Sequence, residues 1–107
     1  MDSFNDRERA EEKKFQLSQE LEFKAQARRN KRLGLWAAEH MGLAGEAAEA
    51  YARTVVAADM AEAGDHDVFR KVRADFDAKG VAQSDHQIRA RMDELLIEAR
   101  TDVKAGN

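Results

Sequence analysis

Apolar residues recur at helical spacing along most of this chain, and the pattern predicts four helices. The clearest stripe lies over 85–104, a shorter one over 66–79, and a third, rich in alanine, over 46–63. The first predicted helix runs over 16–41 and has a less stable extension from Ser3. The stripes consist of Phe23, Ala27, Gly34, Ala37 and Met41; Ala48, Tyr51, Ala52, Val55 and Val56; Val68, Phe69, Val72 and Phe76; and Ile88, Met92, Leu95, Leu96, Ala99 and Val103.

Turn and capping residues separate these helices. The glycine-containing run 42–45 breaks the chain after the first helix. Asp65 is placed to cap the third helix, and Gly80 stands where a helix end favours a left-handed residue. Ser84 and Gln87 have the spacing of a capping box. Because the connections are short, we expect antiparallel neighbours and an all-α four-helix bundle.

The N-terminal segment 1–15 differs from the rest of the chain. Phe4 and Phe15 are 11 residues apart and fall on nearly one helix face, but glutamates occupy the positions between them. A helix that is charged nearly all round gains little from packing on its own domain. We therefore expect a mobile segment over 1–15, attached to a helical bundle domain over 16–107.

Composition narrows the class of protein. Charged residues make up 36% of the chain, the net charge is −3, and there is no Cys or Pro. No apolar run approaches the roughly 20 residues that span a bilayer, and the polar N-terminus is unlike a secretory signal. The acidic balance argues against general nucleic-acid binding. We expect a cytoplasmic protein that does not insert into membranes.

Signals for catalysis are nearly absent. Asp65, His66 and Asp67 are consecutive, so their side chains point in different directions and we expect no metal site there. No serine has His and acid partners at motif spacing, and no glycine-rich phosphate loop is present. We expect no enzyme activity.

A basic patch over 24–32 allows several readings. It contains no acidic residue and includes Lys24, Arg28, Arg29, Lys31 and Arg32. These cations are suited to carboxylates on a partner or to the phosphates of a nucleotide. Equally, they are suited to acids of the same bundle, because a charge run is usually a solvated and locally paired face.

Four segments carry a resemblance that covers almost the whole chain: FNDRERAEEKKF, FKAQARRNKRLGLWAAEHMG, VFRKVRADFDAKG and SDHQIRARMDELLIEAR. They are similar to the zeta family of ATPase inhibitor subunits, which accompanies the F-type ATP synthase of alphaproteobacteria. The run ARRNKRLGLWAAE is the most specific part, since no general packing rule requires it. The resemblance implies a small helical bundle with an inhibitory N-terminal segment.

The resemblance also implies a mechanism. The N-terminal helix would insert between the catalytic head and the rotor stalk and stop ATP hydrolysis, while the free protein is a monomer. When bound, it would lie at the inner face of the plasma membrane. No cofactor is required, although weak ATP or ADP binding is associated with the family. The candidate inhibitory residues are Phe4, Arg7, Arg9, Lys13, Lys14 and Phe15.

Two alternatives remain open from the sequence. The first is a nucleotide-sensing binding module that uses the basic patch as its phosphate site. The second is a scaffold that stabilises a complex through its helices and inhibits nothing. One departure from the family pattern is the pair Lys13-Lys14, which makes the N-terminal segment more basic than expected.

Overall fold

The computed structural model describes the backbone of residues 3–59 and 65–106, and the side chains from Ser18 onward within these ranges. Within them the chain forms four helices in the order α1, α2, α3 and α4. Their bounds are α1 Ser3–His40, α2 Gly45–Ala58, α3 His66–Lys79 and α4 Asp85–Lys104. The all-α four-helix fold expected from the pattern is confirmed.

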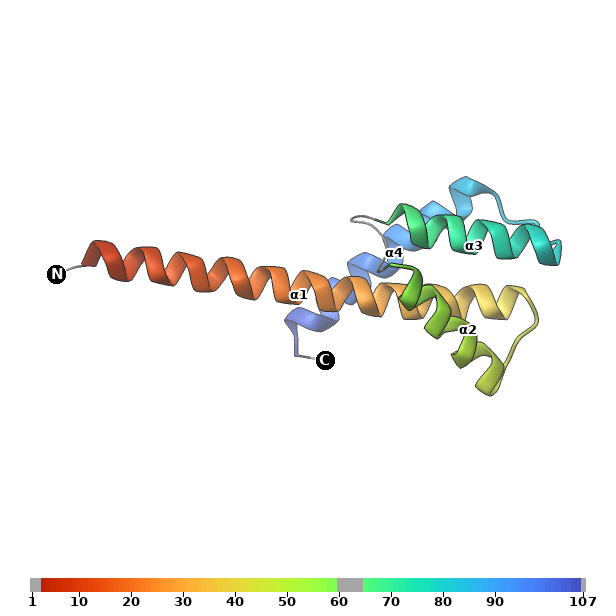
Figure 1. Cartoon of the computed structure of the whole chain (residues 1–107), viewed down its shortest axis with the longest axis horizontal. Helices are drawn as coiled ribbons and strands as arrows, with labels where there is room; N and C mark the ends of the chain where they lie inside the picture. Colours follow the sequence, from red (N-terminus) through yellow and green to blue (C-terminus); the bar gives the residue numbers. More distant parts are fainter. Residues whose placement is uncertain (1–2, 60–64, 107) are drawn as a thin grey trace.

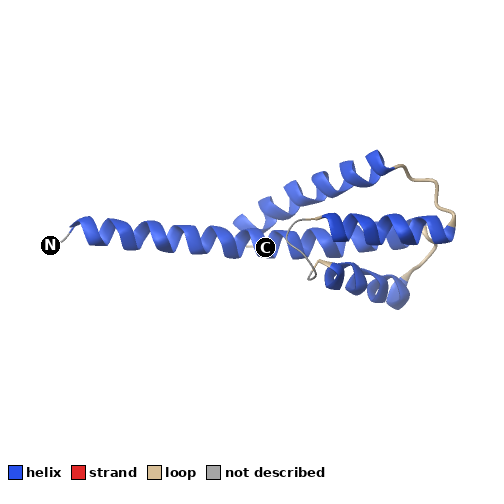
Figure 2. Cartoon of the chain, turned by 45° about the horizontal axis from the view of Figure 1, so that its top comes forward, coloured by secondary structure: helices blue, strands red, loops and turns tan. Residues whose placement is uncertain are grey.

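The four helices form an elongated molecule of 65 × 24 × 21 Å, because α1 is much longer than the other three. α2 and α4 pack against the C-terminal half of α1, and α3 bridges them on the remaining side (Figure 1). The N-terminal part of α1 projects beyond the bundle in both views (Figures 1 and 2). No described helix is long and apolar enough to cross a membrane.

Most of the buried core comes from the predicted stripes, to which α1 adds Ala25 and Leu33. All four helices contribute to one apolar cluster, and a smaller cluster joins α1 to α4. Trp36 and Tyr51 pack at the edge of the main cluster and are only partly buried. The main cluster contains Leu33, Ala37, Val55, Val68, Val72, Phe76, Ile88, Met92 and Leu95, and the smaller one contains Ala25, Ala99 and Val103.

α1 and α2 approach each other closely at Gly34. A Cβ atom at this position would lie 2.6 Å from the Cα of Ala52 and 3.3 Å from the Cβ of Val55. Real Cβ atoms do not approach backbone atoms so closely, so only glycine allows this crossing. The close packing of α1 and α2 therefore depends on the absence of a side chain at this position of the first stripe.

The boundaries of α3 and α4 agree with the sequence. Gly80 ends α3 with a φ of 70°, and the N–H of Val81 donates to the Phe76 carbonyl at 2.9 Å. At the start of α4, the backbone N–H of Gln87 donates to Ser84 Oγ, and the backbone N–H of Ser84 donates to Gln87 Oε1. This reciprocal pair is the capping box that the sequence predicted.

The end of the second helix differs from expectation. α1 is one unbroken helix from Ser3, which includes the predicted helix and its predicted extension. α2 ends at Ala58, five residues before the predicted end, and residues 60–64 lie outside the described residues. Phe23 was expected in the buried stripe, but 75% of its surface is exposed, so that assignment was wrong.

Phe23 is exposed because α2 is much shorter than α1. Phe23 is on the same row of α1 as Gly34, about 16 Å further toward the N-terminus at 1.5 Å per residue. From Ala52, opposite Gly34, α2 continues for only about 9 Å before Ala58. Phe23 therefore lies beyond the end of the helix that covers the rest of its row.

We expect Leu95→Ala to lower the free energy of unfolding by about 2–5 kcal/mol, because a buried side chain is lost and a cavity remains. Leu95 is 4% exposed, whereas Ile97, two residues later on α4, is 64% exposed. Ile97→Ala is the matched control and should cost less than about 0.5 kcal/mol. Chemical denaturation measures both variants, and equal losses would contradict the assigned core.

Gly34→Ala should also destabilise the bundle, although alanine is favoured over glycine inside a helix by about 1 kcal/mol. The new methyl group would meet the backbone of α2, and a strained core contact costs about 1–3 kcal/mol. Thermal or chemical unfolding decides between the two effects. A more stable Gly34→Ala variant would show that α1 and α2 do not pack as closely as described.

Candidate functional site

Both sets of candidate residues lie on α1. The inhibitory set, from Phe4 to Phe15, belongs to the projecting part of the helix, and its side chains lie outside the described residues. The basic patch over 24–32 lies where α1 enters the bundle, and its side chains are described. The structure therefore places the two sets on one continuous helix, about two turns apart.

Arg29 is the cation of the basic patch that the bundle buries, with 2% of its surface exposed. Its Nε donates to Asn30 Oδ1 at 2.6 Å, and its Nη1 lies 3.8 Å from Asp65 Oδ2. Burial lowers the pKa of Arg29, while the charge of Asp65 opposes this effect. Arg29 therefore stabilises the interior of the bundle and is not available to a partner.

Asp65 has a different role from the one predicted for it. It occupies the N-cap position of α3, but its carboxylate makes no capping hydrogen bond. Instead it accepts from Arg89 Nη1 at 3.1 Å and faces the buried Arg29. The charged donor Arg89 competes successfully with the helix backbone N–H groups, because charged donors make stronger hydrogen bonds, and the charge of Arg29 adds to this attraction. One carboxylate thus connects α1, the start of α3 and α4.

Two further ion pairs fix α1 to α4 (Arg32–Asp102 and Glu22–Arg100). Arg32 Nη2 lies 2.5 Å from Asp102 Oδ2. Glu22 accepts three hydrogen bonds from Arg100, and the two shortest are 2.9 Å from Nε and 2.6 Å from Nη2. These bonds lower the pKa of Glu22. Of the ion pairs between described residues, Glu22–Arg100 lies nearest the N-terminus, at the place where α1 leaves the bundle.

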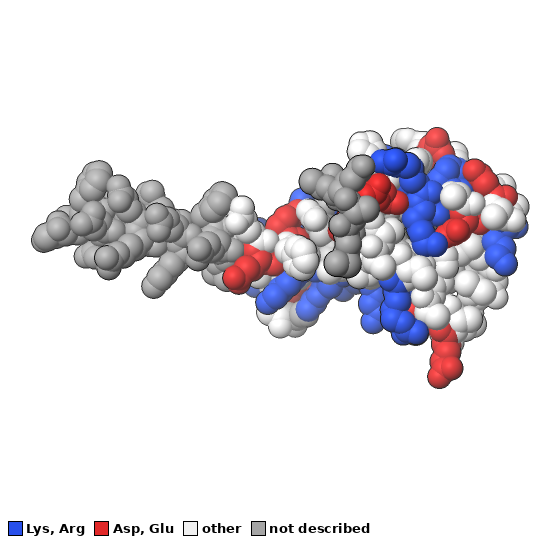
Figure 3. Space-filling model, in the orientation of Figure 1, with Lys and Arg blue, Asp and Glu red and all other residues white. Residues whose placement is uncertain are grey.

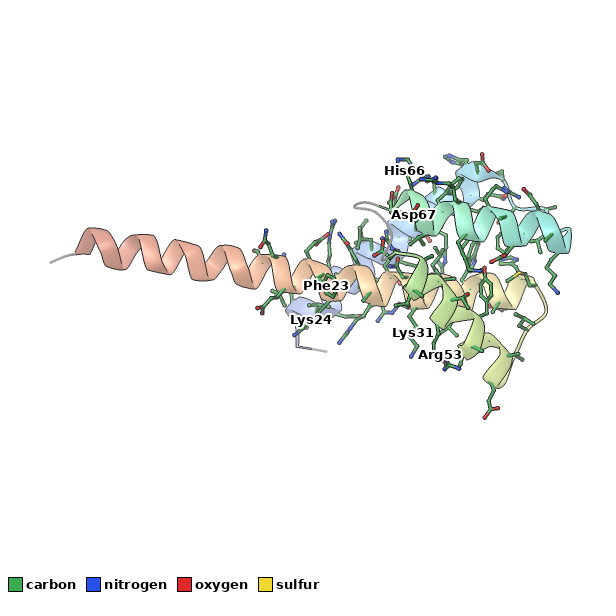
Figure 4. The ribbon with its side chains drawn as sticks, in the orientation of Figure 1. Phe23, Lys24, Lys31, Arg53, His66 and Asp67 are labelled. Atoms are coloured by element: carbon green, nitrogen blue, oxygen red, sulfur yellow. The ribbon has the colours of Figure 1, made fainter. Side chains whose placement is uncertain are left out.

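The remaining cations of the patch face outward. Lys24 is exposed and Arg28 is half-buried, and neither has an ion-pair partner among the described side chains. Lys31 is exposed, 3.9 Å from Glu49 on α2, and such a surface pair contributes little. In Figure 3 blue side chains gather along the lower edge of the molecule, over α1 and α2. Figure 4 shows Lys31 of α1 and Arg53 of α2 on the same lower side of that view.

The structure thus divides a patch that the sequence presents as one run. Arg29 and Arg32 serve the bundle, whereas Lys24, Arg28 and Lys31 remain at the surface. Sequence could not make this division, because Asp65 and Asp102 lie far along the chain from their partners. Arg53, an exposed cation on α2, was not predicted, because it lies outside the run over 24–32.

The histidines and their acidic neighbours are also accounted for by packing. His66 Nδ1 and Asp65 both contact the guanidinium of Arg89, and the ring of His40 lies 4.8 Å from that of Trp36. Among the described side chains, which cover 18–59 and 65–106, no group of three His, Asp or Glu residues could hold a metal ion.

Asp65→Asn should destabilise the fold by about 1–3 kcal/mol, because it leaves Arg29 buried without a counter-charge. The control is Glu94→Gln, which removes the exposed ion pair with Arg91 and should cost less than about 1 kcal/mol. Urea denaturation at neutral pH measures both. If the two variants lose the same stability, Asp65 does not hold the buried cation.

Two of three comparisons with known proteins found a match. The comparison with curated proteins found no significant match. A solved solution NMR structure shares 44% sequence identity and a TM-score of 0.71 with it, over 81% of this chain and 99% of that chain. A family model, described as ATPase inhibitor subunit zeta, matches residues 1–102. Because this match spans nearly the whole length, the chain belongs to the ATPase inhibitor subunit zeta family.

Proposed function

We propose that this protein inhibits ATP hydrolysis by the F-type ATP synthase by inserting its N-terminal helix between the catalytic head and the rotor. The observation that carries the proposal is the single helix α1, which is anchored in the bundle at one end and projects beyond it at the other (Figure 1). From Glu22 to Ser3 the helix extends about 29 Å at 1.5 Å per residue. That length is enough to reach from the outside of a protein assembly into a cleft.

The composition of the segment 1–15 fits an element that is stabilised by its partner. An isolated helix of this length is marginal in water, and this one has no continuous apolar face. On binding, Phe4 and Phe15 would enter apolar pockets, and the basic residues would pair with acidic surfaces of the head and rotor. The basic residues in question are Arg7, Arg9, Lys13 and Lys14. The N-terminal helix would become ordered as it binds, and the bound helix would stop the rotor from turning.

The bundle would hold the inserted helix in place from the outer side of the head, facing the cytoplasm at the inner side of the plasma membrane. Lys24 and Arg28 support this docking role, because they face outward without ion-pair partners among the described residues. Arg29 and Arg32 do not, since both are engaged within the bundle. The burial of Arg29 and the ion pair of Arg32 with Asp102 also weaken the alternative of a phosphate site over 24–32.

Deleting residues 2–15 should remove inhibition and leave the thermal midpoint of the bundle nearly unchanged, because the described core lies entirely in the remaining chain. The combined change Phe4→Ala and Phe15→Ala should have the same effect without shortening the helix. Steady-state ATP hydrolysis by the cognate head is measured against rising concentrations of each variant, with circular dichroism melts in parallel.

The control for this experiment is the double variant Lys24→Ala and Arg28→Ala, which should weaken inhibition but not abolish it. These charges contribute to docking, whereas the inserting segment stays intact. If the chain without residues 2–15 inhibits as well as the full chain, the bundle and not the N-terminal helix blocks rotation.

A further inference from the structure

Phe23 is the most exposed of the large apolar side chains that the structure describes, with 75% of its surface accessible. A single exposed apolar side chain is common and by itself indicates nothing. Its position is what distinguishes Phe23. It lies on α1 directly beside Glu22, which makes the last ion pair to α4 where the helix leaves the bundle, and it lies away from α2 and α3 (Figure 4).

Phe23 belongs to a row of α1 that is built to receive a helix. Gly34, Ala27 and Phe23 recur at helical spacing, and Phe23 and Gly34 differ by only about 20° around the helix axis. Gly34 is the point of closest approach to α2. Because α2 ends at Ala58, the last position of the row has no covering helix among the described elements. α1 therefore presents a helix-packing face that extends past the helix that covers it.

The bundle side of the same turns of α1 is already engaged. Leu21 and Ala25 pack with Ala99 and Val103 of α4, and Glu22 is bound by Arg100. Phe23 points away from this contact, so its exposure does not result from loose packing against α4. An apolar ring that the bundle does not use remains available to another protein.

The surroundings of Phe23 define the chemistry of an occupant. Gln19, Glu20, Phe23 and Lys24 form an open, nearly flat patch on one side of α1. Glu20 and Lys24 are exposed and have no ion-pair partner among the described residues. A complementary surface presents an apolar side chain for the ring, a basic group toward Glu20 and an acidic group toward Lys24.

We propose that Phe23 and its flanking charges form a second contact with the catalytic head, onto which a helix of the head packs in line with α2. This inference rests on the proposed function, because the head is the partner only if the segment 1–15 inserts there. Phe15 and Phe23 are about 12 Å apart along one helix at 1.5 Å per residue. A partner that grips the inserted segment and extends toward the bundle reaches Phe23 before it reaches the end of α2.

The first experiment compares Phe23→Ala with Ile97→Ala in the full chain. Both side chains are exposed, and Ile97 lies on α4, so the two truncations remove similar apolar surface at different places. Phe23→Ala should raise the concentration for half-maximal inhibition of ATP hydrolysis by at least about tenfold, as expected for a buried aromatic anchor. Ile97→Ala should change it by less than about twofold, and both variants should melt like the parent.

The second experiment identifies the occupant directly. A photo-crosslinking p-benzoylphenylalanine at position 23 of the full chain should join to a subunit of the catalytic head, whereas the same group at position 97 should not. A crosslink from position 23 to a second copy of this chain would overturn the proposal, because the occupant would then be another molecule of the inhibitor.

The outcomes separate this inference from the proposed function. Normal inhibition by Phe23→Ala, together with loss of inhibition on deletion of residues 2–15, would refute the second contact and leave the inserting helix in place. If the full chain does not inhibit the head, the proposed function fails. In that case a crosslink from position 23 to the catalytic head still supports the contact of Phe23 with the head. The absence of this crosslink overturns that contact.

Discussion

The structure depends on a mismatch of helix lengths. α1 has 38 residues, whereas α2, α3 and α4 have 14, 14 and 20. Three short helices can bury only one end of a long one, so the core gathers around the C-terminal half of α1. Everything that distinguishes this molecule from an ordinary bundle follows from the other half. The projecting helix, the exposed Phe23 and the position of the last ion pair are all results of that uncovered length.

Within the bundle, apolar packing and paired charges have different tasks. The apolar clusters supply most of the favourable free energy of folding. The long-range ion pairs add little to that total where they are exposed, but they fix which face of each helix meets which neighbour. Asp65 does this for three segments at once, because it faces Arg29 of α1 and binds Arg89 of α4 from the start of α3. In a bundle rich in alanine, the small side chains interlock weakly. Ion pairs between helices therefore help to fix how the helices are aligned with one another.

The features that could be predicted from the sequence are those that depend on local spacing. The stripes of α3 and α4, the capping box at Ser84 and the left-handed Gly80 all use neighbours within one or two turns. The features that could not be predicted depend on residues far apart in the chain. Glu22 and Arg100 are separated by 78 positions, and no local sequence pattern near either residue predicts that they pair. The exposure of Phe23 depended on where α2 stops, which the alanine-rich pattern up to residue 63 did not reveal.

The placement of Glu22–Arg100 gives the molecule a mechanical property. A sideways load on the tip of α1 acts through a lever of about 29 Å, with this ion pair as the fulcrum. Such a load concentrates on one contact at a time and peels α1 from α4. A pull along the axis of α1 instead shears all the contacts with α2 and α4 together. The same helix is therefore compliant to bending near residue 22 and resistant to extraction from the bundle.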